Sequence, residues 1–177
     1  MLKKMVLAGC FMAAMMGSSF AAQQTYVVGS GGTYRPFEFE NSQKQLEGFD
    51  IDIIKAVAKA EGFDIKLVNT PWEGIFATLN SGDRDIIISG ITITDKRQQM
   101  VDFSAPYFPA EQSIVVPNGS KVDSVNALKG QKVGVVNSST GDIVVSEVLG
   151  KNSTDIKRFD NTPLMLQELY EDGLGAA

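Results

Sequence analysis

The feature that most constrains the fold is an alternation of short apolar runs with helical segments through the first half of the chain. In the clearest helical segment, Ile54 and Val57 share one face and Gly62 ends the pattern. Phe37–Glu40 is expected to extend the first strand. The expected order is strand, helix, strand, helix, strand, over Tyr26–Ser30, Asp50–Glu61, Phe63–Asn69, Pro71–Ser81 and Asp85–Ile88. This order implies a parallel sheet with right-handed crossovers.

The second half resumes the alternation after a break at Pro117-Asn118-Gly119-Ser120. Ser124 is expected to cap a short helix, and Thr162 to cap a helix that starts at Pro163. The expected elements are helix Val125–Lys129, strand Lys132–Val136, helix Asp142–Leu149, strand Asp155–Phe159 and a last helix through Leu166 and Leu169. We therefore predict an α/β protein with a first lobe over residues 22–114 and a second over residues 115–177.

The N-terminus has the pattern of a signal peptide. Two lysines precede an apolar stretch, and Ser19-Phe20-Ala21 is a small-x-small cleavage signal, so we expect a leader over residues 1–21 and export to the periplasm. The run Leu7-Ala8-Gly9-Cys10 has the chemistry of a lipobox. Almost no apolar core separates it from the lysines, so soluble export is favoured over a lipid anchor at Cys10.

Composition excludes several functions. The chain has no histidine, and its one cysteine, Cys10, lies in the leader. The exported part therefore has no disulfide, no thiolate metal site and no cysteine nucleophile, and most zinc chemistry is excluded. The net charge is −5, and loss of Lys3 and Lys4 makes it more negative. Such a chain is not expected to bind nucleic acid or anionic lipid.

The run Asp85–Phe108 predicts a carboxylate-binding site. A buried strand ends there in small, hydroxylated residues from Ser89 to Thr92, and Thr94 is placed to cap a short helix that carries Arg97. Backbone N–H groups, hydroxyls and a guanidinium delivered to one place suit a carboxylate, which arginine grips with two charge-assisted hydrogen bonds. The alternative is that Thr94 is only a cap and Arg97 a solvated surface charge.

Other candidate ligand contacts also follow strand ends, where open parallel sheets bind their ligands. Tyr34 and Trp72 offer flat apolar faces, although packing in the core is the common role of aromatic residues. In the second lobe the polar turn Asn137–Gly141 follows a strand. The alternative for this turn is an ordinary helix-capping role.

Several distinct motifs follow one another along the chain. They are Tyr34-Arg35-Pro36-Phe37-Glu38-Phe39, Leu46-Glu47-Gly48-Phe49-Asp50-Ile51-Asp52, Asn69-Thr70-Pro71-Trp72-Glu73-Gly74, Ser89–Arg97 with Val101–Tyr107, and Lys129–Val135. In this order and spacing they resemble the periplasmic polar amino-acid-binding proteins of ABC importers, extracellular solute-binding protein family 3. The resemblance implies a two-lobed, periplasmic binding protein-like (type II) fold with parallel-sheet βαβ lobes. It also implies a polar L-amino acid in the cleft between the lobes, delivered to a membrane ABC permease.

The resemblance implies a ligand site of Tyr34, Trp72, Ser89, Gly90, Thr92, Arg97, Asn137, Thr140 and Gly141. Arg97 would hold the ligand carboxylate with the backbone of Thr140 and Gly141, and Asn137 would contact the ligand side chain. Gly31 stands where several relatives selective for basic side chains or glutamine carry an acidic residue, so the amino acid itself is left open. A monomer is expected, with no catalytic residue, no metal and no cofactor.

The second lobe is expected to be incomplete. The family carries the carboxylate that holds the ligand ammonium in a strand just after the helix that here ends near Asp172, and the chain ends at Ala177. The return crossover to the first lobe is also expected to be missing. We predict from this that residues 132–177 lack part of their core and exchange their amide protons quickly.

Two other functions remain open on the same scaffold. A periplasmic dehydratase-like enzyme would need a positioned acid or base, for which Glu38, Glu73 and Glu111 are the candidates. A ligand-sensing module of a receptor would need a membrane helix or signalling domain after it. Two acidic groups are given structural roles: Asp50 and Asp52 at a helix N-terminus rather than as a metal pair, and Asp83-Arg84-Asp85 as a solvated turn.

Overall fold

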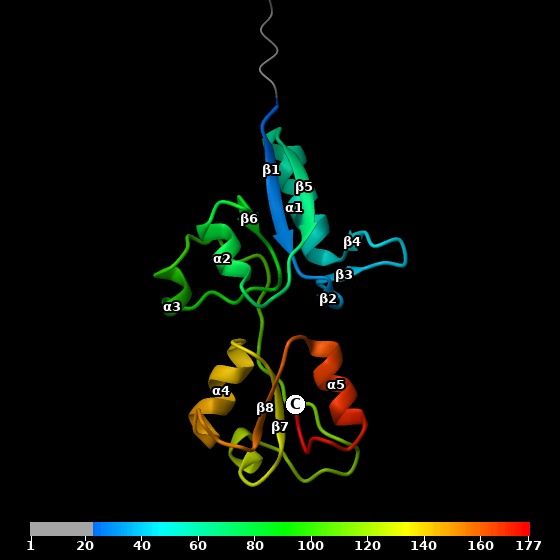
Figure 1. Cartoon of the computed structure of the whole chain (residues 1–177), viewed down its shortest axis with the longest axis vertical. Helices are drawn as coiled ribbons and strands as arrows, with labels where there is room; N and C mark the ends of the chain where they lie inside the picture. The colour runs from blue at the N-terminus through cyan, green and yellow to red at the C-terminus, as the bar shows by residue number, and fades with distance from the viewer. Residues whose placement is uncertain (1–22) are drawn as a thin grey trace, which may run out of the picture.

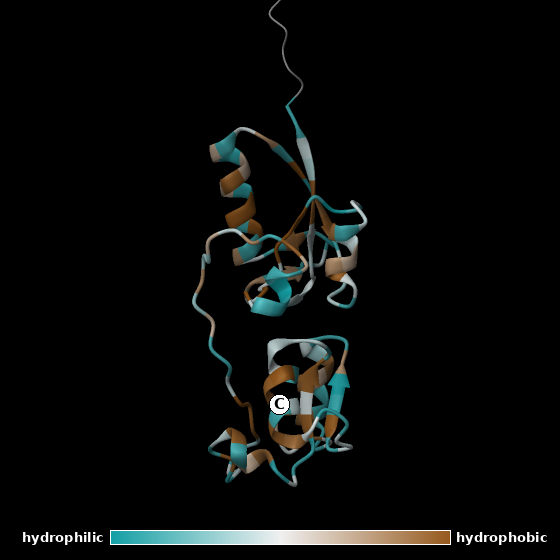
Figure 2. Ribbon diagram, turned by 90° about the vertical axis from the view of Figure 1, so that its left-hand side faces the viewer, coloured by the Kyte–Doolittle hydropathy of each residue, from teal (hydrophilic) through white to brown (hydrophobic). Residues whose placement is uncertain are grey.

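The chain forms two lobes stacked along its long axis (Figure 1). The structure, a computed structural model, describes residues 23–177, so the expected leader and Cys10 lie outside the described residues. Residues 102–123 contain no helix or strand and run along one side of the molecule from one lobe to the other (Figure 2). The expected lobe boundary falls inside this segment. Within the described part of the chain, no helix is long and apolar enough to cross a bilayer.

Lobe 1 is built on the predicted parallel sheet. Its strands are β1 (Thr25–Ser30), β5 (Asp64–Asn69) and β6 (Ile86–Ile87), in the order β5-β1-β6 with both pairings parallel. The helices are α1 (Phe49–Glu61), α2 (Ile75–Asn80) and α3 (Asp95–Gln98). The β-α-β-α-β order is confirmed, although α2 begins after Gly74 rather than at Pro71.

The core of lobe 1 lies between the sheet and α1. Val28 on the central strand is fully buried and pairs with Leu67 and Ile86 on its two neighbours. Ile54 of α1 packs into the same buried cluster. The helix ends at Gly62 as predicted, because this residue adopts the left-handed conformation that glycine reaches without a Cβ clash.

A small antiparallel sheet was not anticipated. Phe37–Glu40 does not extend β1; instead β2 (Thr33–Tyr34), β3 (Glu38–Glu40) and β4 (Leu46–Glu47) form a separate meander. The Gly31–Gly32 turn allows the chain to reverse direction after β1. Tyr34 is thereby paired with Glu38 at the carboxyl end of the parallel sheet.

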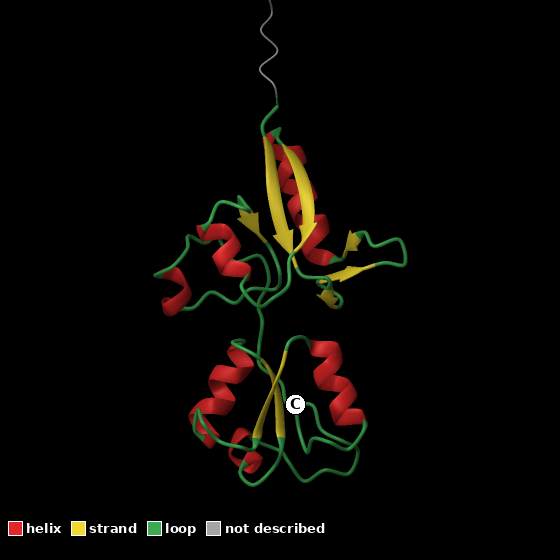
Figure 3. Ribbon diagram, viewed as in Figure 1, coloured by secondary structure: helices red, strands yellow, loops and turns green. Residues whose placement is uncertain are grey.

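Lobe 2 pairs two parallel strands, β7 (Val133–Val136) and β8 (Ile156–Phe159). The helices α4 (Thr140–Leu149) and α5 (Thr162–Tyr170) flank them, and a short 3₁₀ helix, η1 (Val125–Leu128), precedes them (Figure 3). The cap of α5 is Asn161 rather than Thr162, because the Asn161 side chain accepts a hydrogen bond from Leu164 N–H at 3.0 Å.

The last residues of the chain add to this sheet. Gly134 N–H donates to the carbonyl of Ala176 at 2.9 Å, and Val115 and Ala177 exchange two backbone hydrogen bonds. A buried apolar cluster results, formed by Leu128, Val133, Val135, Val145, Ile156 and Ala176. Lobe 2 therefore has a core of its own, more than the sequence led us to expect. The fast amide exchange of this half stays a prediction.

The turn before β6 is more tightly held than expected. Asp83 and Asp85 are exposed, as a solvated turn requires. However, Arg84 Nε donates to Thr70 Oγ1 at 3.0 Å, and an Asp85 carboxylate oxygen accepts from Val27 N–H at 2.7 Å. The turn is tied in this way to the edge of the strands that carry the site.

Candidate ligand-binding site

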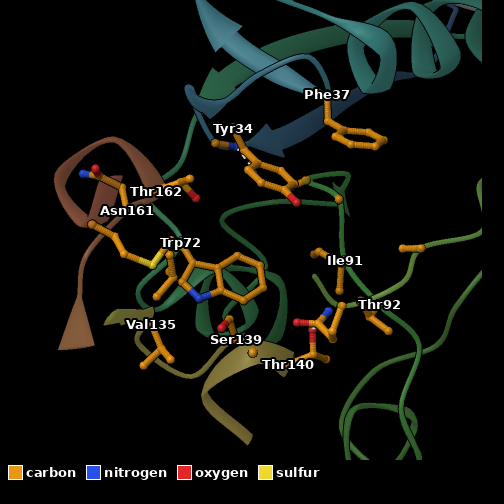
Figure 4. Close-up of a pocket in the computed structure, with 18 of the residues that line it drawn as sticks. Tyr34, Phe37, Trp72, Ile91, Thr92, Val135, Ser139, Thr140, Asn161 and Thr162 are labelled. Carbon is orange, nitrogen blue, oxygen red and sulfur yellow. Dashed lines mark hydrogen bonds between the residues drawn. The ribbon is translucent and has the colours of Figure 1, made fainter. Parts of the chain in front are cut away.

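A cavity of about 1060 Å³ lies between the lobes and is lined by both. Eight of the nine candidate ligand contacts line it: Tyr34, Trp72, Ser89, Gly90, Thr92, Arg97, Thr140 and Gly141. Figure 4 shows the Tyr34 ring above Trp72, with Ser139 and Thr140 below. Asn137 does not line this cavity. It lies at a smaller one, of about 140 Å³, on the other side of Trp72.

Arg97 is buried without a carboxylate partner in the described part of the chain. It is 6% exposed, and no carboxylate among residues 23–177 forms a salt bridge with it. Burial lowers the pKa of the guanidinium. Nη1 donates to the carbonyl of Thr92 at 2.9 Å, and the backbone N–H of Arg97 donates to Thr94 Oγ1 at 3.2 Å, which confirms Thr94 as the cap. The structure therefore presents a fixed, desolvated positive charge to the cavity.

Two contacts bring lobe 2 against this charge. Arg97 Nη2 lies 3.4 Å from the carbonyl oxygen of Ser138, and Trp72 Nε1 donates to the carbonyl of Asn137 at 2.9 Å. The Arg97 guanidinium is also 5.3 Å from the Trp72 ring, within cation–π range. The turn that follows β7 in lobe 2 is thus in direct contact with the arginine and the tryptophan of lobe 1.

The N-terminus of α4 faces the same place. Ser139 caps it by accepting from Asp142 N–H at 3.1 Å, and Thr140 and Gly141 form its first turn. The first N–H groups of a helix have no intrahelical partner and carry a partial positive charge, which favours an anion. Gln112 Nε2 donates to Thr140 Oγ1 at 3.1 Å, so the connecting segment also reaches this helix end.

The aromatic wall of the cavity includes Phe37 in addition to the predicted Tyr34 and Trp72. Tyr34 stacks on Phe37 with ring centroids 5.5 Å apart and planes 15° apart. Gly90 lies under the Tyr34 ring: a Cβ on this residue, which has φ +56°, would come within 3.2 Å of it. A side chain at position 90 would therefore displace the ring that walls the cavity.

Ser89 and Gly90, which were expected to contact a ligand, make hydrogen bonds within the protein. Ser89 Oγ donates to Glu38 Oε1 at 2.7 Å and accepts from Gly31 N–H at 3.1 Å. Gly90 N–H donates to Asp50 Oδ2 at 2.6 Å. The Ser89 hydroxyl and the Gly90 N–H are therefore hydrogen-bonded within the protein.

Asp50 does not have the role assigned to it from the sequence. It is fully buried and makes no capping hydrogen bond with α1, whose cap is Gly48. Its carboxylate instead accepts from Gly90 N–H and, at 2.9 Å, from the Tyr107 hydroxyl. The sequence offered no signal for this, since periodicity places Asp50 only at the start of a helix.

Two buried carboxyl groups have perturbed acidity. Burial, together with the neighbouring Asp50, raises the pKa of Glu38 to about 8, against a hydrogen bond from Ser89 that lowers it. Burial also raises the pKa of Asp50. The pKa of the Tyr107 hydroxyl is raised by burial and by the Asp50 charge.

Further lining residues were not predicted as ligand contacts. They are Phe37, Asn69, Glu73, Ile91, Glu111, Gln112, Val135, Ser139, Asp160, Asn161 and Thr162. Of these, Glu73 and Glu111 were named from the sequence only as a possible acid or base of an enzyme. Phe37 and Glu73 stand inside the motifs that located Tyr34 and Trp72, which was the available signal. The ionisable lining groups of the described chain, apart from tyrosine, are four acids and one base: Glu38, Glu73, Glu111, Asp160 and Arg97.

A two-lobed α/β fold with a buried arginine at the cavity between its lobes is typical of a class of solute-binding proteins. The sequence profile of the bacterial extracellular solute-binding proteins, family 3, matches residues 26–174, and the chain belongs to this family.

Individual relatives agree with this assignment. The chain is 47% identical over 152 residues to a probable histidine-binding protein of Neisseria gonorrhoeae, an alignment that covers 85% of this chain and 57% of that protein. It superposes with a TM-score of 0.83 and 42% identity on an arginine-, lysine-, histidine-binding protein of Geobacillus stearothermophilus, over 86% of this chain and 65% of that one. An ancestral amino acid-binding protein, a precursor of cyclohexadienyl dehydratase, gives a TM-score of 0.80 and 38% identity over 86% of this chain and 68% of that one. The chain thus spans less than two thirds of the Neisseria relative.

Proposed function

We propose that this protein binds the α-carboxylate of a free amino acid between its lobes. The observation that carries the proposal is the buried, unpaired guanidinium of Arg97 facing the N-terminus of α4. A carboxylate placed there receives a bidentate pair from Arg97 and hydrogen bonds from Thr140 and Gly141 N–H, which compensates the desolvation of the arginine. The Gly90 carbonyl can accept from the ligand ammonium.

The cavity favours an amino acid with a basic or aromatic nitrogen-containing side chain. Glu73, Glu111 and Asp160 line it and supply negative charge beyond what the ammonium group of the ligand requires. The faces of Tyr34 and Trp72 suit a flat cation or ring through cation–π and stacking contacts. Relatives named for binding histidine, arginine and lysine support this choice.

The role proposed for the whole protein is capture of this amino acid outside the cytoplasmic membrane and delivery to an ABC importer, without chemical change. The similarity to a precursor of a dehydratase raises the alternative of an enzyme. Glu38 is the lining acid whose pKa is shifted, but Oε1 is held by Ser89 and Oε2 is sealed from the cavity. It is therefore not placed to act on a ligand.

The test is calorimetry of the purified chain with L-histidine, L-arginine, L-lysine, L-glutamine and L-glutamate. We expect binding of the basic ligands and loss of binding on Arg97→Met, since removing a buried charge pair costs about 2–5 kcal/mol. Arg35→Met is the matched control, because Arg35 is exposed and stacks on Phe39 away from the cavity. Equal affinity in the wild-type and Arg97→Met proteins would overturn the proposal. Turnover of a bound acid would favour the enzyme.

A further inference from the structure

A pair of buried carboxyl groups lies behind the ligand-binding loop. Glu38 comes from β3 and Asp50 from the first turn of α1, and their residues are 2% and 0% exposed. Neither carboxyl group forms an ion pair with a lysine or arginine among residues 23–177. Burial of two acids without a cation is costly, so a specific arrangement must compensate it.

The hydrogen bonds of this pair join three separate segments of the chain. Glu38 Oε1 accepts from Ser89 Oγ, which itself accepts from Gly31 N–H. Asp50 accepts from Gly90 N–H on one oxygen and from the Tyr107 hydroxyl on the other. The pair therefore fixes the turn after β1, the Ser89–Gly90 loop under the Tyr34 ring, and the segment that connects the lobes.

One oxygen of the pair requires a proton. Glu38 Oε2 is buried and accepts no hydrogen bond, and its polar neighbour is the Asp50 carboxylate. Two adjacent carboxylates cannot both be ionised at low cost, whereas a protonated Glu38 can donate to Asp50. The titratable groups that face Glu38 are Asp50 on α1 and Tyr107 on the connecting segment. Neither supplies a positive charge.

We propose, on the basis of the function proposed above, that Glu38 and Asp50 are positioning residues that share one proton, and that this proton holds the Ser89–Gly90 loop and Tyr107 in the geometry that binds ligand. Loss of the proton places a second negative charge against Asp50. The repulsion then loosens Gly90 N–H and the Tyr107 hydroxyl from their common acceptor, and amino-acid affinity falls.

The acidity of the pair sets the pH range. With the pKa of Glu38 raised to about 8, the proton is held at neutral pH and lost as the pH rises through 8. In the unfolded chain the same group titrates near its ordinary value of 4.5. Between these two pH values the folded state holds a proton on Glu38 that the unfolded state has lost. The contribution of this proton to the free energy of unfolding is therefore fully present below pH 4.5 and is lost as the pH rises toward 8.

The first experiment measures L-arginine affinity by calorimetry from pH 6 to pH 9 in the wild-type protein and in Glu38→Gln. Glutamine keeps a donor toward Asp50 and an acceptor for Ser89 but cannot ionise. Relative to Glu38→Gln, which shares the titration of the ligand, wild-type affinity should fall about tenfold between pH 7 and pH 9. Glu40→Gln is the control, because Glu40 is on the same strand but pairs with Lys44 at the surface. Its profile should match the wild type.

The second experiment measures urea unfolding without ligand from pH 5 to pH 8. The unfolding equilibrium constant should rise about tenfold per pH unit more steeply in the wild type than in Glu38→Gln. Asp50→Asn, which removes the repelling charge, should lower the pKa of Glu38, so the pH-dependent loss of stability should end at a lower pH than in the wild type. If the unfolding equilibrium constant depends on pH in the same way in the wild type and Glu38→Gln, the shared proton is overturned. If the unfolding of the two proteins differs in its pH dependence but their ligand affinity does not, the positioning role is overturned. Absence of L-arginine binding in every variant would contradict the proposed function, and the unfolding slopes would still decide on the proton.

Discussion

At the scale of single residues, the site depends on groups whose charge or shape is unfavourable without a partner. Arg97 is buried without a carboxylate partner among residues 23–177, and a ligand carboxylate in the cavity, as proposed, would offset the cost of its desolvation. Gly90 adopts a positive φ directly under the Tyr34 ring. Both residues line the cavity in which we propose that the ligand binds, so substitution at either position is expected to change ligand affinity.

Gly90→Ala is expected to lower both stability and ligand affinity. A non-glycine residue in the left-handed region costs about 1–2 kcal/mol, and the new methyl would come within 3.2 Å of the Tyr34 ring. Gly82→Ala is the matched control, because φ is +78° there and no atom lies within 4 Å of the place that its new methyl would occupy. Chemical denaturation and calorimetry should show that both variants lose stability but that Gly90→Ala alone loses affinity. Unchanged affinity in Gly90→Ala would show that the Tyr34 ring position is unimportant.

At the scale of elements, the proposed site includes the first turn of helix α4. Its cap, Ser139, lines the cavity and satisfies Asp142 N–H, while Asp142 in turn binds Ser138 N–H and Arg158. This network fixes the end of the helix, so the N–H groups of Thr140 and Gly141 keep one direction. A helix end that frays would present these donors poorly to a carboxylate.

Ser139→Ala is expected to destabilise lobe 2 by about 1 kcal/mol, the usual effect of losing an N-cap. Amino-acid affinity should also fall, because the donors at the helix end become mobile. Ser124→Ala provides the comparison, since Ser124 stands at the cap position of η1 but makes no capping hydrogen bond. Unfolding curves and calorimetry of both variants check this. Equal effects of the two substitutions on affinity would argue against a role for the α4 terminus.

At the scale of the whole molecule, two polar contacts among residues 23–177 join the lobes across the cavity. Trp72 Nε1 donates to the carbonyl of Asn137, and the longer contact from Arg97 reaches Ser138. Both acceptors belong to the turn between β7 and α4. These contacts therefore hold together the groups of the two lobes that we propose bind the ligand carboxylate.

Trp72→Phe should weaken this closed arrangement while keeping an aromatic face in the cavity. Loss of one neutral hydrogen bond is worth about 0.5–1.5 kcal/mol, or roughly a 2- to 13-fold loss of affinity. We expect this loss to appear as faster dissociation of the ligand, measured by stopped-flow tyrosine fluorescence or by displacement with a competing ligand. Phe63→Leu serves as control, since Phe63 packs on Tyr26 far from the cavity. An unchanged dissociation rate in Trp72→Phe would contradict the interlobe role.

The sequence by itself determined the features that depend on near neighbours along the chain. Helical periodicity placed α1, the pattern of apolar residues placed β1 and β5, and local capping chemistry identified Thr94 beside Arg97. These interactions span four residues or fewer, or follow from alternation within one segment, so the order of the residues contains them. Motif order extended this to the family and to eight of the residues that line the cavity.

Only the tertiary structure decided which distant groups meet. Ser89 and Glu38 are 51 positions apart, and Gly90 and Asp50 are 40 apart, yet their hydrogen bonds hold the ligand-binding loop. Ala176 joins the sheet of lobe 2 beside β7, and Asn137 turns away from the main cavity. Such contacts depend on how the chain turns after each strand and on which buried polar groups remain to be satisfied. A local sequence pattern contains neither kind of information, because these partners come together only when the whole lobe packs.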